Sequence, residues 1–315
     1  MFKKFETEKD VVVIKGSGKV FTAGGDVKDV VKGSVHGTLT KGYKNSHKTY
    51  EMLANYSKPF VALTDGLAMG GAAIYCTPGR YRVVTERTSF SMPETAIGYF
   101  NDAGASFFLS RLSGNFGVFM GMTGYQVKGY DMIKVGLASH YVESSKLDEL
   151  EMELGKCKAH AEVNQVLDHF ASIPATTDSD LDPVMPLIEK CFEPPTVEEI
   201  FEKLRLNGNG WAKDILKTLK RMSPTSLKVT HRSINLGRNL SMRECLKMEL
   251  RLVHNHITLP SDLKEGCRAV LIDKDNKPNW NPKTLTEVTD EHVRSFFKFI
   301  PEEYESLLDD KKTKL

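Results

Sequence analysis

The stretch from Lys58 to Cys76 reads KPFVALTDGLAMGGAAIYC, and it decides the fold. After an initial proline, Phe60–Thr64 is a short apolar run with the composition of a buried β-strand. Gly66 interrupts this run, and Gly70 and Gly71 then lead into a helical stretch. The segment therefore predicts a strand that passes into a helix through a pair of glycines.

The same pattern occurs on both sides of this segment. Upstream, VVVIKG (11–16) is a β-branched run typical of a strand that is covered on both faces, and TAGGD (22–26) is a turn that opens a helix. Downstream, YRVVTERTSFSMPE (81–94) is a third strand region. DMIKVGLASHYV (131–142) predicts a helix ended by a glycine and followed by a strand. Alternating strands and helices predict an α/β fold.

After about Glu143 the sequence becomes helical. Residues 146–170 have helical period and composition, whereas 171–186, ASIPATTDSDLDPVMP, are polar and proline-rich and predict a loop. Four amphipathic helices are expected beyond this loop: TVEEIFEKLRL (196–206), GWAKDILKTLKRM (210–222), SMRECLKMELRLVHNHI (241–257) and DEHVRSFFKFI (290–300). We therefore expect a core domain over 1–175 and a helical region over 176–315.

The composition excludes several classes of function. Lys and Arg number 43 against 41 Asp and Glu, so the chain has no basic excess of the kind that nucleic-acid binding requires. No apolar run approaches the ~20 residues of a membrane span. The five cysteines are scattered without a C-x-x-C pair, which predicts free thiols in a reducing compartment. The first residues match neither a signal peptide nor a transit peptide.

Two glycine turns carry the first chemical hypothesis. AGGD (23–26) and AMGG (68–71) both lie where a strand passes into a helix. The first N–H groups of a helix have no partner within it, so each turn can present a donor to an anion. Two such turns can hold one oxygen between them, which would form an oxyanion hole. The alternative is that each glycine pair only permits a tight turn.

A second hypothesis comes from two acids. Ser91–Phe108 reads SMPETAIGYFNDAGASFF and holds Glu94 and Asp102 among small, apolar and aromatic residues. Because acids are rarely buried unless they are paired or chemically active, this stretch indicates a chemical role. Two structural alternatives stay open. Ser91 and Glu94 match a capping box, and Asp102 can cap the helix that follows it.

The order and spacing of VFTAGGD, GLAMGG and SMPETAIGYFNDAG resemble the crotonase (enoyl-CoA hydratase/isomerase) superfamily. Within it, the chain most resembles the 3-hydroxyisobutyryl-CoA hydrolase family. The resemblance continues through MTGYQVKGYDMIKVGLASHYV, MSPTSLKVTHR and EGCRAVLIDKDNKPNWNP, so it covers almost the whole chain. It implies a crotonase-like spiral of ββα units followed by an α-helical C-terminal region.

The resemblance also implies roles for individual residues. Gly25 and Gly71 match the positions whose backbone amides bind the substrate oxygen. Glu94 matches the catalytic carboxylate of the MPE motif, and Asp102 matches a second acid that a standard hydratase replaces with glycine. A hydratase carries a further glutamate at the position of Ile74. This chain therefore resembles a hydrolase more than an enzyme that adds water to a double bond.

The implied reaction is hydrolysis of 3-hydroxyisobutyryl-CoA to 3-hydroxyisobutyrate and CoA, in valine catabolism and in the mitochondrion, with neither a metal nor another cofactor. Glu94 is expected to be the base or nucleophile and Asp102 its partner; direct attack and general-base catalysis both fit. An enoyl-CoA isomerase or hydratase, or a non-catalytic acyl-CoA-binding protein, stays an alternative. An acyl-CoA is the expected partner, nucleic acid and membrane are not, and the oligomeric state is open.

Three departures from the family pattern bear on these expectations. Ala72 and the run NDAGAS (101–106) stand where the family is richer in glycine, which bears on the acyl pocket. An acid of related hydrolases aligns near Ser46, so we expect one substrate contact to be lost. Met1 aligns inside the first helix of the family, so we expect the first strand to be missing.

Two further groups of residues have structural alternatives that are more typical than a binding role. Arg268, Lys274 and Lys277 are candidates for the phosphates of CoA, but such a charged run is more typical of a solvated surface. His254 and His256 are two residues apart in helical sequence, so their side chains point to different faces. We therefore predict no phosphate contact and no metal site from them.

Overall fold

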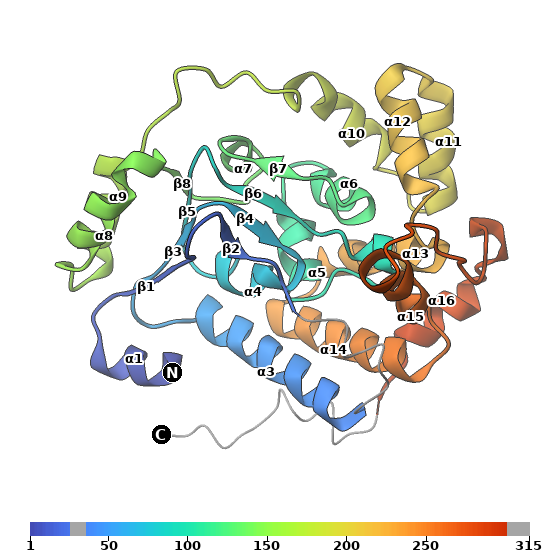
Figure 1. Cartoon of the computed structure of the whole chain (residues 1–315), viewed down its shortest axis with the longest axis horizontal. Helices are drawn as coiled ribbons and strands as arrows, with labels where there is room; N and C mark the ends of the chain where they lie inside the picture. The colour runs from blue at the N-terminus through green and yellow to red at the C-terminus, as the bar shows by residue number, and fades with distance from the viewer. Residues whose placement is uncertain (26–35, 301–315) are drawn as a thin grey trace. The chain divides into compact units, whose positions relative to one another are not determined.

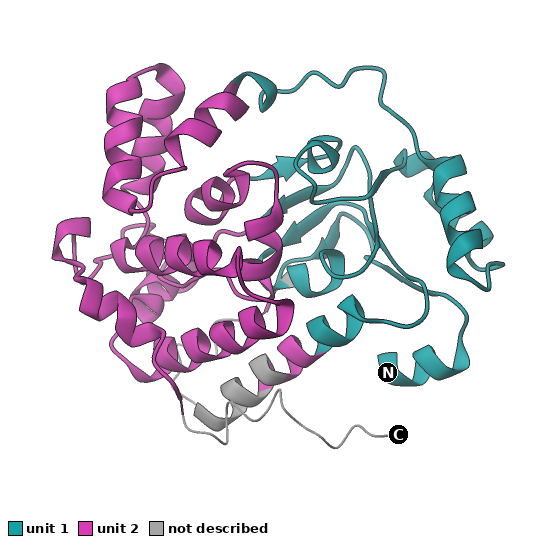
Figure 2. Cartoon of the chain, turned by 180° about the vertical axis from the view of Figure 1, so that it is seen from behind, with its two compact units in different colours: residues 1–24, 49–91, 126–183 teal, residues 25–48, 92–125, 184–315 magenta. Residues whose placement is uncertain are grey.

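The computed structural model of the chain describes residues 1–25 and 36–300, without the side chains of 36–41, 43, 44 and 72. The chain divides into two compact units that interleave along the sequence (Figure 2). Unit 1 comprises residues 1–24, 49–91 and 126–183, and unit 2 comprises residues 25–48, 92–125 and 184–315. The domain boundary expected near residue 175 stays a prediction.

Unit 1 contains two four-stranded sheets, with strand orders β1-β3-β5-β8 and β2-β4-β6-β7 (Figure 1). Neighbouring strands are parallel, except that β6 and β7 are antiparallel. The strands are β1 (Val12–Lys15), β2 (Val20–Thr22), β3 (Phe60–Thr64), β4 (Leu67–Met69), β5 (Tyr81–Val84), β6 (Ser89–Ser91), β7 (Val127–Lys128) and β8 (His140–Tyr141). In the first three successive pairs, the chain places the first strand in one sheet and the second strand in the other, and in the fourth pair, β7 and β8, this order is reversed.

The predicted strand Phe60–Thr64 is confirmed as β3, and all five of its residues are buried. At the β3–β4 turn, Gly66 has a left-handed φ of +86°. A Cβ on Gly66 would lie only 2.3 Å from the carbonyl oxygen of Lys19 in the β1–β2 turn. The repeated turns therefore pack backbone against backbone, which explains why a glycine interrupts the apolar run.

Short helices complete unit 1. They are α1 (Phe2–Glu8), η1 (Gly70–Ala72), α4 (Ala73–Cys76), α7 (Asp131–Lys134), η4 (Ser144–Lys146), α8 (Leu147–Leu154) and α9 (His160–Phe170). Apolar residues of α8 and α9 pack with strand residues in one core, made of Val61, Leu63, Tyr81, Val83, Val142, Leu150, Leu154, Cys157, Val163, Leu167 and Phe170. The helical pattern predicted over 146–170 is confirmed, with a break between α8 and α9. Helix α3 (His36–Ala54) contributes residues to both units.

Unit 2 is helical. Its elements are η2 (Glu94–Ile97), α5 (Ala105–Phe108), η3 (Leu109–Arg111), α6 (Phe116–Thr123), α10 (Met185–Cys191), α11 (Val197–Asn207), α12 (Gly210–Leu219), α13 (Pro224–Gly237), α14 (Met242–Thr258), α15 (Leu263–Cys267), a π-helical turn (Arg268–Ile272), η7 (Leu285–Glu287) and α16 (Asp290–Phe296). A further turn, η5 (Asp182–Val184), begins in unit 1. The four predicted C-terminal helices are confirmed as α11, α12, α14 and α16, whereas α13 was not predicted as a helix.

Polar side chains explain where these helices begin. Thr196, Asn209, Ser223 and Ser241 each accept a hydrogen bond from the backbone N–H three residues on. At α14 the bond is reciprocal, because the side chain of Glu244 accepts the N–H of Ser241.

Among the described helices, none combines the length and apolarity that a membrane span requires.

The core of unit 2 encloses His256. Its ring centroid lies 5.2 Å from that of Tyr99, 5.0 Å from that of Phe100 and 4.4 Å from that of Phe296. Burial lowers the pKa of His256 to about 4, and Nδ1 lies 2.8 Å from the carbonyl oxygen of Leu252. His256 is therefore a neutral core residue at physiological pH.

The contact between α13 and α5 depends on Gly237. A Cβ on Gly237 would lie 2.0 Å from the carbonyl oxygen of Ser106. Gly237→Ala should therefore lower the free energy of unfolding by ~1–3 kcal/mol in urea titrations, because the helices must separate. Gly210→Ala is the matched control, since no heavy atom lies within 4 Å of its added Cβ. Equal unfolding midpoints for the two variants would contradict this account of the packing.

Candidate active site

Within unit 1, Gly24 of the predicted AGGD turn lies close to the predicted AMGG turn. Gly24 has a left-handed φ of +87°, and its added Cβ would lie 3.0 Å from the carbonyl oxygen of Met69 and 3.4 Å from the amide nitrogen of Gly71. Gly71 is the second residue of η1, and N–H groups at the start of a helix have no partner within it. The backbone of the AGGD turn thus approaches the Gly71 amide at a distance that favours glycine.

Gly25 follows Gly24 within the AGGD turn and is exposed. Its added Cβ would meet no heavy atom within 4 Å among the described residues. Residues 26–35, and with them Asp26 of the AGGD motif, lie outside the described part of the chain, as does the side chain of Ala72. The convergence of the Gly25 and Gly71 amides on one oxygen stays a prediction.

Glu94 is a buried residue of η2 in unit 2, with 7% of its surface exposed. Ser91 is the last residue of β6 and the N-cap of η2 is Pro93, so the capping-box alternative is wrong. Instead, Oε2 of Glu94 accepts a hydrogen bond of 2.8 Å from Nδ2 of Asn101. Gly98 ends η2 in the left-handed conformation, so that the chain turns back and brings Asn101 to the carboxylate.

Asp102 is also buried, with 8% of its surface exposed. The alternative that Asp102 caps the following helix is wrong as well. The N-cap residue of α5 is Gly104, and no side chain forms a capping hydrogen bond there. Between Asp102 and α5, Ala103 and Gly104 both have positive φ, of 61° and 84°. The acid is therefore followed by an unusual backbone turn.

Burial dominates the electrostatics of both acids. It raises the pKa of Glu94 to about 8; the negative charge of Asp102 adds to the effect, and the hydrogen bond from Asn101 opposes it. Burial raises the pKa of Asp102 to about 7; the charge of Glu249 adds to the effect, and that of His47 opposes it. The two carboxyl groups are therefore a coupled pair that keeps about one proton near neutral pH.

The sequence analysis missed two members of this cluster, Glu249 and His47. Glu249 lies on α14 and is 0% exposed, and His47 lies on α3 and is 1% exposed. Nε2 of His47 is 3.3 Å from Oε2 of Glu249. A signal for Glu249 was present in the sequence. Its spacing of four from Cys245 and three from Leu252 places an acid on the apolar face of a predicted helix.

Helix α4 in unit 1 carries no acid. Ile74, at the position where the resemblance places a hydratase glutamate, is a core residue with 8% of its surface exposed. Burial also raises the pKa of Cys76 to about 12, so its thiol is protonated and unreactive at neutral pH. Among the described residues, no group of three or more His, Cys, Asp or Glu side chains is placed to hold a metal ion.

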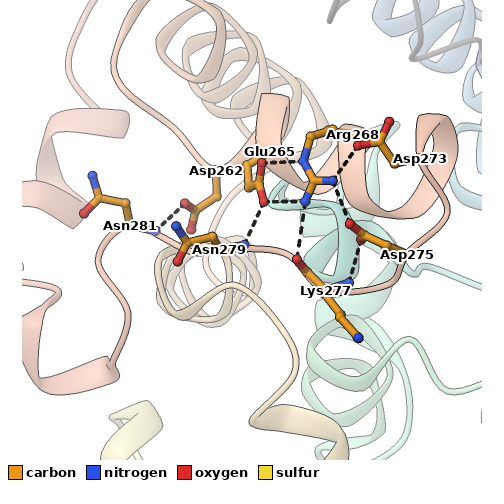
Figure 3. A network of polar contacts seen from close by, with 8 residues as sticks. All are labelled: Asp262, Glu265, Arg268, Asp273, Asp275, Lys277, Asn279 and Asn281. Atoms are coloured by element: carbon orange, nitrogen blue, oxygen red, sulfur yellow. Dashed lines mark hydrogen bonds and ion pairs between the residues drawn. The ribbon is translucent and has the colours of Figure 1, made fainter.

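Figure 3 shows that Arg268 is fully engaged within unit 2. Its guanidinium group donates to the carboxylates of Glu265, Asp273 and Asp275 at 2.6–2.9 Å, and to the carbonyl oxygen of Lys277 at 3.3 Å. Hydrogen bonds from Arg268 lower the pKa of Glu265 to about 2. Three carboxylates around one guanidinium leave it unsuited to a phosphate.

The model of the enoyl-CoA hydratase/isomerase family matches residues 2–297. The chain belongs to the enoyl-CoA hydratase/isomerase family. Its relatives within the family include a probable 3-hydroxyisobutyryl-CoA hydrolase of Arabidopsis thaliana, 40% identical over 96% of this chain and 84% of the relative. The mitochondrial 3-hydroxyisobutyryl-CoA hydrolase of Rattus norvegicus is 41% identical over 94% of this chain and 79% of the relative.

Solved structures of the family confirm the crotonase-like fold. A carnitinyl-CoA dehydratase from Mycobacterium thermoresistibile aligns with a TM-score of 0.86 and 30% identity, covering 95% of this chain and 87% of that one. An enoyl-CoA hydratase from Rhodobacter sphaeroides aligns with a TM-score of 0.83 and 28% identity, covering 96% and 88%. The α/β core with its helical C-terminal region is therefore a family architecture, and the chemistry must be argued from residues.

The pKa of Glu94 makes a prediction for stability. The folded protein holds a proton there up to about pH 8, whereas the unfolded chain releases it near the ordinary value of 4.5. Native stability therefore falls as the pH rises through this window. Glu94→Gln has no proton to lose and can still accept from Asn101. It should gain ~1 kcal/mol or more over the native chain at pH 8, and much less at pH 5.

Urea unfolding at both pH values measures this difference. Glu149→Gln is the matched control, because Glu149 is exposed on α8 and its neutralisation should not change the pH dependence. A stability difference for Glu94→Gln that is the same at pH 5 and pH 8 would contradict the raised pKa.

Proposed function

We propose that this protein is an acyl-CoA thioester hydrolase that converts 3-hydroxyisobutyryl-CoA to 3-hydroxyisobutyrate and CoA. One observation carries the proposal: Glu94 and Asp102 are both buried in unit 2 with pKa values raised to about 8 and about 7. Relatives at about 40% identity that bear the name of this hydrolase support the choice of substrate.

The acid pair supplies what hydrolysis needs. A base must take a proton from the attacking water, and an acid must protonate or orient the groups that receive charge. With about one proton between them at neutral pH, Glu94 and Asp102 provide one ionised and one protonated carboxyl at the same time. A pair of ordinary surface carboxylates would both be ionised at this pH.

Two routes lead to the same products. In the first, Glu94 acts in its ionised form, which becomes more populated as the pH rises towards its pKa of about 8. It removes a proton from water, the water oxygen bonds to the thioester carbon, and the C–S bond breaks as CoA leaves and is protonated. In the second, a Glu94 oxygen itself bonds to that carbon and expels CoA, and water then hydrolyses the mixed anhydride. Only the second route can place label in the Glu94 side chain, and it does so when water attacks the Glu94 carboxyl carbon of the anhydride. Label in Glu94 after a single turnover in ¹⁸O-labelled water therefore identifies the second route.

The proposal assigns the thioester oxygen to the backbone amides of Gly25 and Gly71. Two amide donors at that oxygen would stabilise the negative charge that develops when the carbon is attacked, and the loss of one such donor costs ~3 kcal/mol in known cases. The close approach of Gly24 to the Gly71 amide supports this assignment for the second turn. Asp102 is assigned to orient the substrate hydroxyl or to assist proton transfer.

A second candidate function is hydration or isomerisation of an enoyl-CoA. The solved structures named as a dehydratase and a hydratase favour it. Against hydration, the α4 position that would carry a second glutamate is the buried Ile74, and Asp102 has no role in that scheme. An isomerase that works with one acid remains the stronger form of this candidate.

The relatives also support a location. Those from Danio rerio, Rattus norvegicus and Gallus gallus are named mitochondrial. We include a mitochondrial location and a place in valine breakdown in the proposal.

Release of CoA from 3-hydroxyisobutyryl-CoA, followed with a thiol dye, tests the proposed function. All five cysteines of the chain are buried, so the native protein should add little background. Glu94→Gln should lower kcat by ~10²–10⁴-fold because the base or nucleophile is lost, and Asp102→Asn should lower it by at least ~10²-fold. Glu149→Gln, on the exposed face of α8, should keep the native rate.

Each other outcome decides against the proposal. Rapid hydration or isomerisation of a short enoyl-CoA without thiol release would establish the second candidate. Binding of acyl-CoA without either reaction would make the chain a binding protein. Thiol release that survives Glu94→Gln would remove the acid pair from the mechanism.

A further inference from the structure

The backbone turn that follows Asp102 is held by an acid from a distant part of the chain. Oε2 of Glu249 accepts a hydrogen bond of 2.8 Å from the amide of Gly104. Oε1 of Glu249 accepts bonds from both the amide and the hydroxyl group of Ser106, at 2.9 and 2.6 Å. Both carboxylate oxygens are therefore engaged by the turn, although 143 to 145 residues separate the partners in sequence.

This turn is one that needs support. Ala103 has a φ of 61° and Gly104 a φ of 84°, so two successive residues are in the left-handed region. For an alanine that conformation costs ~1–2 kcal/mol, and such strain persists only where the surroundings fix it. Ala103 is buried, with 4% of its surface exposed. The three bonds to Glu249 supply the fixing contacts directly after Asp102.

His47 completes the arrangement. Its ring lies 3.3 Å from Glu249 and, like Glu249, is almost fully buried. Burial of an isolated carboxylate is costly, whereas burial with hydrogen-bond donors and a positive partner is tolerated. Helix α3 thus places a basic side chain beside an acid of α14, and α14 in turn contributes that acid to the Asp102 turn.

We propose that Glu249, with His47 as its partner, is a positioning residue that holds Asp102 in its working geometry and acts on that acid by its charge. For its effect on catalysis, this inference rests on the proposed hydrolase function. It assigns no contact between Glu249 and the substrate.

Glu249 and His47 have opposite effects on the pKa of Asp102, and these effects can be measured. Among the described residues, Glu249 from α14 and His47 from α3 act on Asp102 by their charge, and Asp102 in turn acts on Glu94 from η2. The charge of Glu249 raises the pKa of Asp102 and the charge of His47 lowers it. The neighbouring Cys245 stays a neutral thiol, because burial raises its pKa to about 11. Removal of Glu249 and removal of His47 must therefore move the titration of Asp102 in opposite directions.

If Glu249 had only a structural role, its substitution would have a different effect. If Glu249 only caps α5, its loss lowers stability and leaves the pH dependence of the active enzyme unchanged. If Glu249 acts through Asp102, its loss changes kcat more than KM, and moves the pH dependence as well.

The test compares Glu249→Gln with His47→Gln in the thiol-release assay between pH 5 and pH 9. We expect Glu249→Gln to lower kcat by ~10²-fold, the scale of a misplaced catalytic group, with KM within ~3-fold of native. The acidic limb of the pH profile of kcat/KM should follow the pKa of Asp102. It should move to lower pH in Glu249→Gln and to higher pH in His47→Gln. Glu244→Gln, an exposed acid on the same helix, should leave the limb in place.

A double-mutant cycle with Asp102→Asn tests whether the effect runs through Asp102. Glu249→Gln should then reduce kcat by less than ~3-fold further, because the group on which Glu249 acts is already neutral. An undiminished loss in this background would overturn the inference. So would limb shifts of the same sign, or no shift, in the two single variants.

Two measures keep the test decisive. If Glu249→Gln does not fold, the direction of the limb shift in His47→Gln alone decides. If the native chain releases no thiol, the proposed function fails, and the inference is still tested by urea unfolding at pH 5 and pH 8. The loss of stability on raising the pH should be smaller than native in Glu249→Gln and larger in His47→Gln, and the reverse order would overturn it.

Discussion

Repulsion between buried carboxyl groups is the constraint on which the rest of the structure depends. Glu94, Asp102 and Glu249 are each at least nine-tenths buried in unit 2, and the ring of His47 lies 3.3 Å from Glu249. Removing a carboxylate from water is costly, so neighbouring buried acids cannot all be ionised together. The carboxylate of Glu249 accepts three hydrogen bonds and lies beside His47. Glu94 and Asp102 instead have raised pKa values and retain protons near neutral pH.

The helical C-terminal region contacts both ends of the segment that runs from Glu94 to Asp102. At the Glu94 end, the amide of Ser223 donates to the carbonyl oxygen of Thr95, and a Cβ on Gly98 would lie 2.3 Å from the carbonyl oxygen of Asp262. The hydroxyl group of Ser223 also donates to the buried carboxylate of Asp262 at 2.6 Å.

At the Asp102 end, α13 approaches the turn through Gly237, and α14 holds it through Glu249. Helices α13 and α14 are therefore part of the structure that keeps two acids buried and apart from solvent. This gives the helical region a physical role in the site without requiring it to touch the substrate.

Local sequence carried much of the fold. The apolar run at Phe60, the AMGG turn and the amphipathic C-terminal helices follow from short-range rules, and they appear in the structure as expected. The helix expected after the AGGD turn lies outside the described residues. The burial of Glu94 and Asp102 also followed from their apolar surroundings. What local rules could not supply were pairings across long distances in the chain. Glu249 reads as one charge in a long helix until the fold brings it against Ser106 and His47.

Two misjudged alternatives show the same limit. Ser91 and Glu94 have the spacing of a capping box, but Ser91 is held in β6 and cannot begin a helix. Asp102 stands where a helix cap is plausible, but Ala103 and Gly104 after it are left-handed. The amide of Gly104 therefore donates to the carboxylate of Glu249 on α14. In both places tertiary contacts override a local motif that is chemically reasonable.

The central claim is that Glu94 and Asp102 share a proton near neutral pH. The most direct measurement is a titration of their side-chain carboxyl carbons by ¹³C NMR in the native chain, with Glu94→Gln and Asp102→Asn used only to assign the signals. The account predicts that the pair does not lose its last proton until above pH 7. Complete ionisation of both groups by about pH 5, as for exposed carboxyl groups, would contradict it.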